Sequence, residues 1–224
     1  DQKILVTGAA GFIGSHLCEA LTALGAEVVA LDNLVGSDGS WANLDGFFTG
    51  RRVEGSILDA DLVADAMAGC SLVFHQAAMG SVPRSLTMPR AYHDNNTTGT
   101  LNVLEAARSV GVTRVMFAAS SSAYGDTPTL PKTETMPVLP RSPYAANKVA
   151  CEALMRAYAI SYQKDDGPDT ANLRYFNIFG PRQNANSAYA AVIAAFATAL
   201  LHDQRPVIYG DGEQSRDFTF VDNA

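Results

Sequence analysis

The sequence predicts an α/β fold organised around a doubly wound parallel sheet. Three observations lead to this fold class: short apolar strands alternate with helical segments, a glycine-rich turn joins the first strand to the first helix, and an acidic residue ends the second strand. The 224 residues are 47% hydrophobic and 17% charged, which is enough chain for one substantial core.

The chain opens with a strand, a turn and a helix in direct succession. Residues 3–7 are a short β-branched run, Gly8–Gly14 supplies the turn, and Ser15–Leu24 has the pattern of an amphipathic helix. Glycine allows the tight turn, close approach of the backbone to a pyrophosphate, and close packing of helix on strand. The helix N-terminus adds free N–H groups and a positive dipole end. This arrangement predicts a Rossmann-type dinucleotide site.

The second strand, 27–31, ends in Asp32, at the spacing of an acid that bonds the ribose hydroxyls of adenosine. No arginine follows Asp32 before Arg51, so a 2′-phosphate would meet repulsion without a partner. The sequence therefore favours NAD over NADP. The loop that follows, Asp32–Gly50, is rich in Gly, Ser and Asn and is expected to be mobile and uninformative.

The remaining elements continue the alternation of strands and helices. Strands are predicted at 52–57, 72–75, 114–119 and 171–175, with crossover helices at 61–67, 92–110 and 144–163. Apolar residues of the two long helices are expected to face the sheet: Leu101, Leu104, Val110, Val149, Leu154 and Tyr158. After Gly180 the pattern changes to a polar loop and an alanine-rich helix at 189–201.

Tyr144 and Lys148 are the most informative residues for chemistry, because two side chains four apart share one face of a helix. A free tyrosine has a pKa near 10, and a fixed neighbouring cation favours the phenolate and brings it toward the working range of a base. Ser120, upstream, is placed to hold a substrate hydroxyl. These three residues predict a proton-transfer site.

Composition argues against several other classes of protein. Three scattered cysteines, Cys18, Cys70 and Cys151, and the lack of a signal segment suit a reducing cytoplasm. The four histidines do not group with them at ligand spacing, so no metal is predicted. A net charge of −7 without a basic stripe argues against nucleic acid and against an anionic membrane.

The motifs together resemble the extended short-chain dehydrogenase/reductase family, in its nucleotide-sugar epimerase and dehydratase branch. They occur in the family's order: the glycine turn, Asp32, 75–78, 96–100, 120–125, 144–148, 173–177 and 210–217. Within the branch, the segments 80–85, 179–183 and 188–193 are most similar to UDP-N-acetylglucosamine 4-epimerases. The resemblance spans the whole chain.

The resemblance implies NAD-dependent 4-epimerisation of a UDP-hexose through a transient 4-keto sugar, in a cytoplasmic homodimer. Ser120, Tyr144 and Lys148 would be catalytic. The implied cofactor contacts are Gly8, Gly11, Phe12, Ile13, Gly14, Asp32, Asn33, Ser56, Ile57, Gln76, Ala77, Ala78, Asn96, Tyr144, Lys148 and Tyr175. The implied substrate contacts are Ser81, Ser121, Ser122, Asn177, Val192, Tyr209 and Arg216. Residues 1–179 would form the NAD-binding domain, and 180–224 the start of an apparently truncated substrate lobe.

Several of these roles have plain structural alternatives. Arg216 would grip a substrate phosphate or pair with Asp217. Tyr209 would stack on uracil or belong to the core. Asn96 would tie the active-site strand in place or cap a helix. The family's Asp-Ile pair at the adenine reads Ser56-Ile57 here, and a hydroxyl accepts a hydrogen bond more weakly than a carboxylate.

Alternative activities are weighed at the residues after Ser120. In 4,6-dehydratases this stretch carries an Asp-Glu pair, and UDP-glucuronate decarboxylases carry a glutamate there, whereas this chain has Ser121 and Ser122. A serine does not easily perform a carboxylate's proton chemistry, so an epimerase is favoured over a dehydratase or a UDP-glucuronate epimerase/decarboxylase. A reductase stays open. A non-catalytic, NAD-sensing module is the alternative from another class.

Overall fold

The computed structural model describes residues 2–36, 39–165, 167–184, 192–208 and 210–224. The chain forms two compact units, Asp1–Arg174 and Tyr175–Ala224. Within the described ranges, no helix is both long and apolar enough to cross a membrane.

The first unit is built on a six-stranded sheet with the order β3-β2-β1-β4-β5-β6. The strands are β1 Lys3–Thr7, β2 Glu27–Asp32, β3 Arg51–Glu54, β4 Leu72–His75, β5 Arg114–Ser120 and β6 Asp169–Tyr175. The pairs from β3 through β5 are parallel. Since the order runs outward in both directions from β1 and β4, the predicted doubly wound parallel sheet is confirmed.

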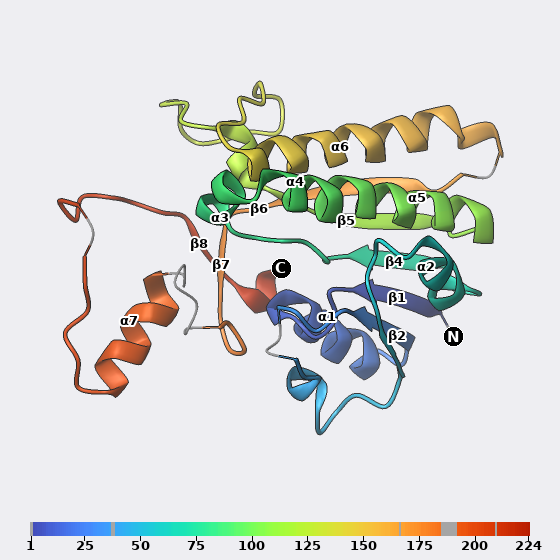
Figure 1. Ribbon diagram of the computed structural model, residues 1–224, viewed down its shortest axis with the longest axis horizontal. Helices are drawn as coiled ribbons and strands as arrows, with labels where there is room; N and C mark the ends of the chain where they lie inside the picture. Colours follow the sequence, from blue (N-terminus) through green and yellow to red (C-terminus); the bar gives the residue numbers. More distant parts are fainter. Residues whose placement is uncertain (1, 37–38, 166, 185–191, 209) are drawn as a thin grey trace. The chain divides into compact units, whose positions relative to one another are not determined.

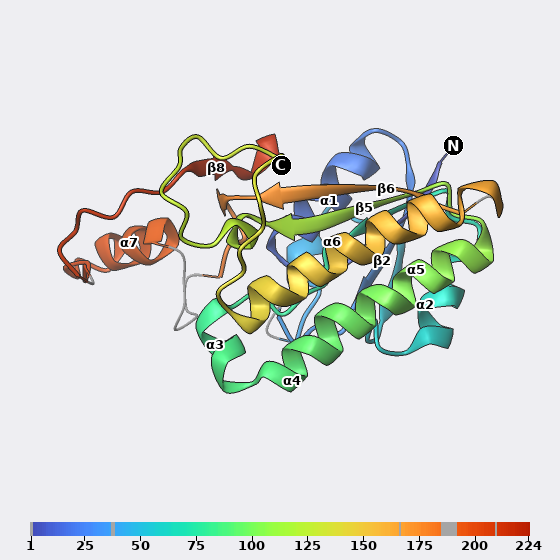
Figure 2. The same cartoon turned by 90° about the horizontal axis from the view of Figure 1, so that it is seen from above.

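Helices cover both faces of this sheet, as Figures 1 and 2 show. They are α1 Phe12–Ala23, α2 Ala60–Met67, α3 Val82–Thr87, α4 Pro89–Tyr92, α5 Gly99–Val110 and α6 Pro143–Ser161. Short turns lie at Ala42–Leu44, Ser121–Tyr124 and Gln163–Asp165, with a π-helical turn at His93–Thr98. Helices α2, α5 and α6 share one face, and α1 lies on the other.

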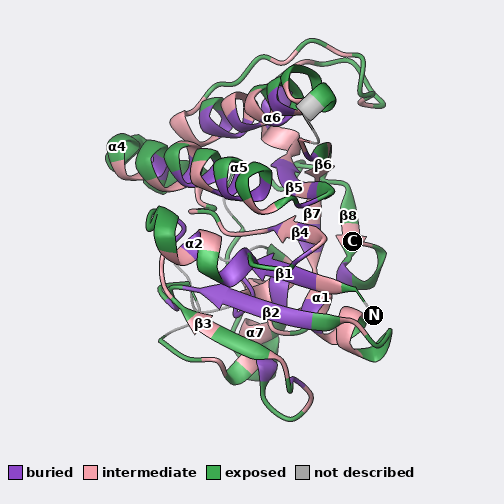
Figure 3. Ribbon diagram, turned by 90° about the vertical axis from the view of Figure 1, so that its right-hand side faces the viewer, coloured by how far each residue is buried: buried purple, intermediate pink, exposed green. Residues whose placement is uncertain are grey.

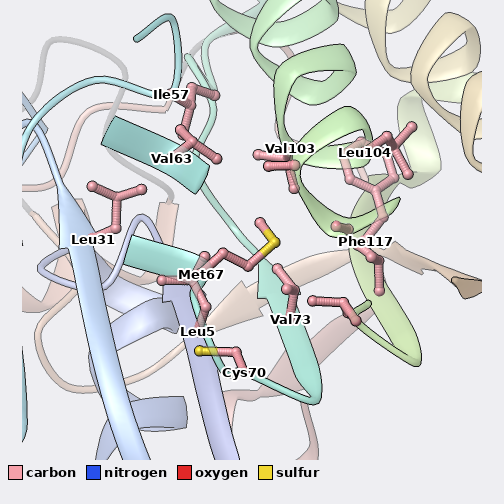
Figure 4. Close-up of a cluster of buried hydrophobic side chains, with 14 of the residues drawn as sticks. Leu5, Leu31, Ile57, Val63, Met67, Cys70, Val73, Val103, Leu104 and Phe117 are labelled. Atoms are coloured by element: carbon pink, nitrogen blue, oxygen red, sulfur yellow. The ribbon is translucent and has the colours of Figure 1, made fainter. Parts of the chain in front are cut away.

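Alternation along the strands divides the core into two layers. Leu5 packs into the cluster beneath α2, α5 and α6, whereas its neighbour Val6 packs toward α1. Val29 and Val28 divide in the same way on β2. The first layer, part of which is drawn in Figure 4, is the larger. Strands β1 and β2 are buried on both faces (Figure 3). Burial on two faces explains their nearly continuous apolar sequences.

Two local predictions are wrong. The helix expected at 92–110 is present, because α4, the π-helical turn and α5 follow one another without a gap, but Asn96 lies inside the π-helical turn rather than capping a helix. Leu101, expected to face the sheet, is 37% exposed. Leu101 lies in the same regular helix as the buried Val103, Leu104 and Ala107, and ordinary helical spacing places it off the face that they share.

The segment after Asp32 is better ordered than expected. Its described part contains a 3-10 turn, Ala42–Leu44, and the buried side chains Leu44 and Phe48. The Arg52 guanidinium lies 5.9 Å from the ring centres of both Trp41 and Phe48. Strand β3 ends at Glu54, short of the predicted 57, so Ser56 and Ile57 lie in the following loop.

The second unit contains a parallel strand pair, β7 Asn177–Phe179 and β8 Phe218–Phe220. It also contains α7 Val192–Leu201 and a 3-10 turn at Val221–Asn223. The first three residues of the helix predicted at 189–201 lie outside the described residues. The assignment of NAD binding to 1–179 and of substrate binding to 180–224 stays a prediction.

Candidate active site

The glycine turn brings backbone groups together more closely than any side chain would allow. Gly8 has a φ of +68°, and a Cβ there would lie 2.7 Å from the backbone nitrogen of Ala77. A Cβ on Gly14 would lie 2.0 Å from the Gly8 carbonyl oxygen. Gly11 stands at the N-cap position of α1 in an extended conformation. The turn therefore forms a cradle of bare backbone at the start of a helix, which suits a pyrophosphate.

Asp32, at the end of β2, is tied to this cradle. Its Oδ2 accepts a hydrogen bond from the Ala10 N–H at 2.9 Å, and its Oδ1 accepts from the Leu34 N–H at 2.7 Å. Burial raises the pKa of Asp32, and the N–H groups of Leu34, Ala10 and Gly11 oppose that rise. Its neighbour Asn33 accepts from the Val35 N–H at 3.2 Å. Asp32 thus holds the cradle's shape as well as presenting a carboxylate.

Asn43 is a contributor that the sequence analysis missed. Its Nδ2 donates to the Ala10 carbonyl at 2.8 Å, so Ala10 is held by Asp32 on one side and by Asn43 on the other. The contact joins residues 33 apart across a loop whose composition carries no motif. Local sequence therefore gave no signal for it.

The loop after β4 lies against the glycine turn. The Ala77 N–H donates to Thr7 Oγ1 at 3.2 Å. The Gln76 side chain has both amide atoms buried, and neither has a hydrogen-bond partner among the described residues. A buried amide in this state is costly unless a ligand or water satisfies it. Ala78, next along the loop, is exposed.

The three predicted catalytic residues come together from β5 and α6. Helix α6 starts at Pro143 after an N-cap serine, Ser142, whose Oγ accepts from the Ala145 N–H at 3.1 Å. Tyr144 therefore lies in the first turn, and its phenol hydrogen bonds with Ser120. Lys148, one turn later and 3% exposed, donates from Nζ to the Ala118 carbonyl at 2.7 Å.

Burial dominates the electrostatics of this trio. It raises the pKa of Tyr144, and the hydrogen bond with Ser120 opposes the rise. It lowers the pKa of Lys148 to about 8. Lys148 is not among the groups that shift the pKa of Tyr144, so the predicted lowering by Lys148 together with the charge of oxidised NAD stays a prediction. The Lys148 Nζ is 5.9 Å from the Tyr144 ring centre and is bonded to a carbonyl instead.

Ser122 contacts the side chain of Ser120. Its Oγ lies 2.8 Å from Ser120 Oγ, and its N–H donates to the same oxygen at 3.2 Å. Ser121 is half-buried in the same 3-10 turn. Strand-end hydrogen bonding is therefore observed for Ser122, at the position where a family dehydratase would carry its glutamate.

Tyr92 connects the loop at Ser81 with Tyr144, the tyrosine predicted to be catalytic. Its hydroxyl accepts from the Ser81 N–H at 3.2 Å, and its ring stands edge-on to Tyr144 with centres 6.5 Å apart. The Ser81 hydroxyl caps α3 by accepting from the Arg84 N–H at 3.3 Å. The sequence analysis did not include Tyr92, which is 1% exposed and reads as core.

Asn96 binds the backbone of Met79 at both polar groups. Its Oδ1 accepts from the Met79 N–H at 2.8 Å, and its Nδ2 donates to the Met79 carbonyl at 3.1 Å. Because Met79 belongs to the loop after β4, Asn96 fixes that loop. The Asn96 side chain was predicted to hold the active-site strand in place, and it holds the loop after β4 instead.

The predicted adenine pair has structural partners. Ser56 Oγ accepts from the Leu58 N–H at 3.1 Å, and Ile57 is buried in the larger core layer. Asn102 on α5 donates to the Ile57 carbonyl at 3.0 Å and holds this loop in place. The Ile57 side chain thus packs in the core. The sequence alone did not distinguish this packing from a contact with adenine.

Comparison with known proteins bears on this site. The model of the NAD dependent epimerase/dehydratase family matches residues 4–224. The chain belongs to this family. A UDP-glucose 4-epimerase from Mycolicibacterium smegmatis is 42% identical over 227 residues, with 99% of this chain and 70% of the relative covered.

Solved structures of family members have the same fold. A UDP-N-acetylglucosamine 4-epimerase from Methanobrevibacter ruminantium M1, in complex with UDP-N-acetylmuramic acid, superposes with a TM-score of 0.90 at 42% identity. The superposition covers 99% of this chain and 69% of the Methanobrevibacter chain. A UDP-glucose 4-epimerase from Thermotoga maritima with UDP-glucose gives 0.91 at 35% identity, covering 99% and 70%. The predicted family, fold class and NAD cofactor are confirmed.

The residues proposed for the sugar nucleotide in the second unit are described only in part. Asn177 donates from Nδ2 to the Asp217 carbonyl at 2.9 Å, and Arg216 donates to the Ser215 carbonyl at 2.7 Å. Val192 begins α7 and is 42% exposed. Tyr209, the remaining predicted substrate contact, lies outside the described residues, and Tyr175, a predicted cofactor contact, ends β6. These roles stay predictions.

Proposed function

We propose that this member of the NAD dependent epimerase/dehydratase family inverts C4 of a UDP-hexose, either UDP-N-acetylglucosamine/UDP-N-acetylgalactosamine or UDP-glucose/UDP-galactose. The observation that carries the proposal is the half-buried pair Tyr144 and Ser120 beside the buried Lys148, in the same sheet unit as the glycine cradle that follows β1. Relatives of similar sequence are named for both sugar pairs.

The cradle and its neighbours fit NAD. The bare backbone of Gly8, Gly11 and Gly14 would receive the pyrophosphate, and Asp32 would accept from the adenosine ribose hydroxyls. The orphaned Gln76 amide offers a donor and an acceptor to the ligand. When bound there, NAD would supply the hydride acceptor for oxidation at C4 and the hydride donor for its reversal.

The chain's own residues handle the proton. Ser120 orients the O4 hydroxyl through its Oγ, and Tyr144 takes the O4 proton as C4 is oxidised to the ketone. Because burial raises the pKa of Tyr144, its action as a base needs positive charge nearby. Lys148 lies one helical turn away, and the charge of oxidised NAD would add to it in favouring the phenolate. After the 4-keto sugar turns its other face, Tyr144 returns the proton to O4 and C4 is inverted. No external redox partner is consumed.

A second candidate reaction is dehydration, because an NAD dependent NDP-hexosamine 5,6-dehydratase is 36% identical with a TM-score of 0.88. Ser122 argues against it. A side chain at this position touches the Ser120 hydroxyl, and here it is a neutral hydroxyl rather than a carboxylate. Decarboxylation of a UDP-glucuronate is disfavoured on the same ground.

Incubation of the purified protein and NAD with UDP-N-acetylglucosamine, and separately with UDP-glucose, tests the proposal. Anomeric proton signals followed by NMR should show growth of the galacto-configured sugar nucleotide from at least one of them. A dehydrated sugar nucleotide, either a 5,6-alkene or a 4-keto-6-deoxy sugar, would establish the second candidate instead. Failure to convert either substrate, with NAD demonstrably bound, would contradict the proposed reaction.

The assembly and location proposed here follow from the family resemblance. We infer a homodimer that works in the cytoplasm, without nucleic acid or membrane as partner. Size-exclusion chromatography with light scattering distinguishes the dimer from a monomer. The net charge of −7 supports the absence of an electrostatic attraction to nucleic acid.

A further inference from the structure

A chain of buried hydrogen bonds joins the end of β1, the end of β4 and the start of α5. Thr7, His75 and Thr100 are each at most 1% exposed. Thr7 Oγ1 lies 2.7 Å from His75 Nδ1, and His75 Nε2 lies 2.9 Å from Thr100 Oγ1. Both ring nitrogens are therefore bonded to hydroxyls.

The neighbouring bonds fix the direction of each step. The Thr100 hydroxyl donates to the Asn96 carbonyl at 2.6 Å, so its single hydrogen is used and its oxygen accepts from His75 Nε2–H. Nδ1 then has no hydrogen and accepts from the Thr7 hydroxyl. The Thr7 oxygen accepts from the Ala77 N–H at 3.2 Å. Every hydrogen in this arrangement has an acceptor.

The opposite tautomer cannot satisfy the same contacts. With the hydrogen on Nδ1, the Thr7 oxygen would accept two hydrogen bonds, one from Nδ1–H and one from the Ala77 N–H. The hydrogen of the Thr7 hydroxyl could then no longer be donated to the ring. Nε2 would then need the hydrogen of Thr100, which is given to Asn96. An unpaired buried group costs more than an ordinary hydrogen bond contributes.

This chain anchors the loop that follows β4. The Ala77 end of the loop is bonded through Thr7, and its nitrogen is the closest atom to a Cβ built on Gly8. The Met79 end is held by the two bonds from the Asn96 side chain. The chain that passes through His75 also ends on the Asn96 carbonyl. Both ends of the loop therefore depend on one connected network.

We propose that His75 is a positioning residue for NAD: as a neutral ring with its hydrogen on Nε2, it orders the loop 76–79 against the glycine turn. The inference rests on the proposed cofactor use, because the ordered loop carries the buried amide of Gln76 that a dinucleotide would satisfy. His75 touches neither sugar nor proton. It acts through Thr7 and Thr100.

The environment of the ring agrees with this state. Burial, followed by the charge of Lys148, lowers the pKa of His75 to about 3. The ring therefore stays neutral throughout the range in which the protein would work. Phe117, whose ring centre is 5.6 Å away, excludes water from one side.

The tautomer is measured directly by long-range nitrogen–proton correlation NMR on protein labelled with nitrogen-15 histidine, without any ligand. A His75→Gln variant identifies the signals of His75 among the four histidines. The expected pattern at pH 6 is a neutral ring protonated on Nε2. A ring protonated on Nδ1, or a charged ring, overturns the proposal.

The positioning role is measured with a matched pair of variants. Thr7→Val keeps the shape of the side chain but removes the hydroxyl, and Thr7→Ser keeps the hydroxyl but removes the methyl group. NAD affinity by calorimetry should fall about tenfold in Thr7→Val and stay within about twofold of wild type in Thr7→Ser. The His75 signals should change in Thr7→Val alone.

Other results decide against the inference. Equal losses in both variants would assign Thr7 to packing, and an unchanged affinity in Thr7→Val would remove the link to the cofactor. A wild-type protein that does not bind NAD would overturn the proposed function and the cofactor part of this inference. The tautomer would still be decided by NMR, so the two failures are distinguishable.

Discussion

The two halves of the candidate site are built from different materials. The phosphate half, comprising Gly8–Gly14 and Asp32, consists of backbone that is held by close packing and by N–H groups bonded to a carboxylate. The proton half, comprising Ser120, Tyr144 and Lys148, consists of side chains, and burial there opposes the charged forms of Tyr144 and Lys148. The phosphate half requires a particular backbone shape. The proton half contains groups that lower the stability of the fold but are needed for the proposed chemistry. Substitutions should therefore have opposite signatures in the two halves.

Tyr144→Phe should have the largest effect on turnover. It removes the group that exchanges the O4 proton, so kcat is expected to fall roughly a thousandfold while NAD stays bound. The stability should not fall, because a buried phenol that needs a partner is replaced by an apolar ring. Single-turnover assays and calorimetry with NAD give the two readings.

Tyr158→Phe is the matched control for this loss. Tyr158 lies on the same helix, and its hydroxyl donates to Glu105. Its activity should stay near that of wild type. Full activity in Tyr144→Phe would end the proposed mechanism, and loss of NAD binding would move Tyr144 from chemistry to structure.

Gly14→Ala should produce the opposite signature in the phosphate half. Its Cβ would lie 2.0 Å from the Gly8 carbonyl oxygen and 2.9 Å from the Ala9 Cα, and backbone cannot rotate away as a side chain can. We expect a loss of roughly 3 kcal/mol in the free energy of unfolding, with NAD binding lost as well. Urea denaturation measures the first and calorimetry the second.

Gly36→Ala is the control for glycine replacement itself. A Cβ there meets nothing within 4 Å. The expected change in stability is within about 0.5 kcal/mol. If both alanine variants behave alike, close packing at the glycine turn is not what the phosphate half requires.

Lys148→Met should raise stability while it abolishes activity. The folded protein lowers the pKa of Lys148 from 10.5 to about 8, so holding the charge at pH 7 costs free energy. Allowing for the lost hydrogen bond to the Ala118 carbonyl, we expect a gain of about 2 kcal/mol. Exposed Lys164, replaced by Met, should change stability little.

The pH dependence provides an independent check on the same residue. Between pH 8 and 9.5 the unfolded chain keeps the Lys148 proton that the folded chain has released, so the stability of the wild type should rise with pH relative to Lys148→Met. Below pH 8 this relative slope should vanish. A Lys148→Met protein that is less stable than wild type at pH 7 would show that the buried charge of Lys148 does not lower the free energy of unfolding.

Sequence predicted the residues of both halves but not the contacts that support them, for a physical reason. The glycine turn, Asp32, Tyr144 and Lys148 are local patterns whose spacing alone places them on one strand end or one helix face. The network through His75 joins positions 68 and 25 residues apart, so no local period reveals it. The π-helical turn at His93–Thr98 was likewise hidden, because its residues look like an ordinary helix.

Asn43→Ala should have the smallest effect and tests whether the phosphate half depends on side chains at all. The variant loses one hydrogen bond to the Ala10 carbonyl, which corresponds to about 1 kcal/mol of stability and a few-fold loss of NAD affinity. Asn43→Asp should do worse, because it places a second carboxylate close to the turn that Asp32 already serves and cannot donate to Ala10. If both variants match wild type in denaturation and calorimetry, Asp32 and close packing are sufficient to shape the turn, and the contrast between the two halves becomes sharper.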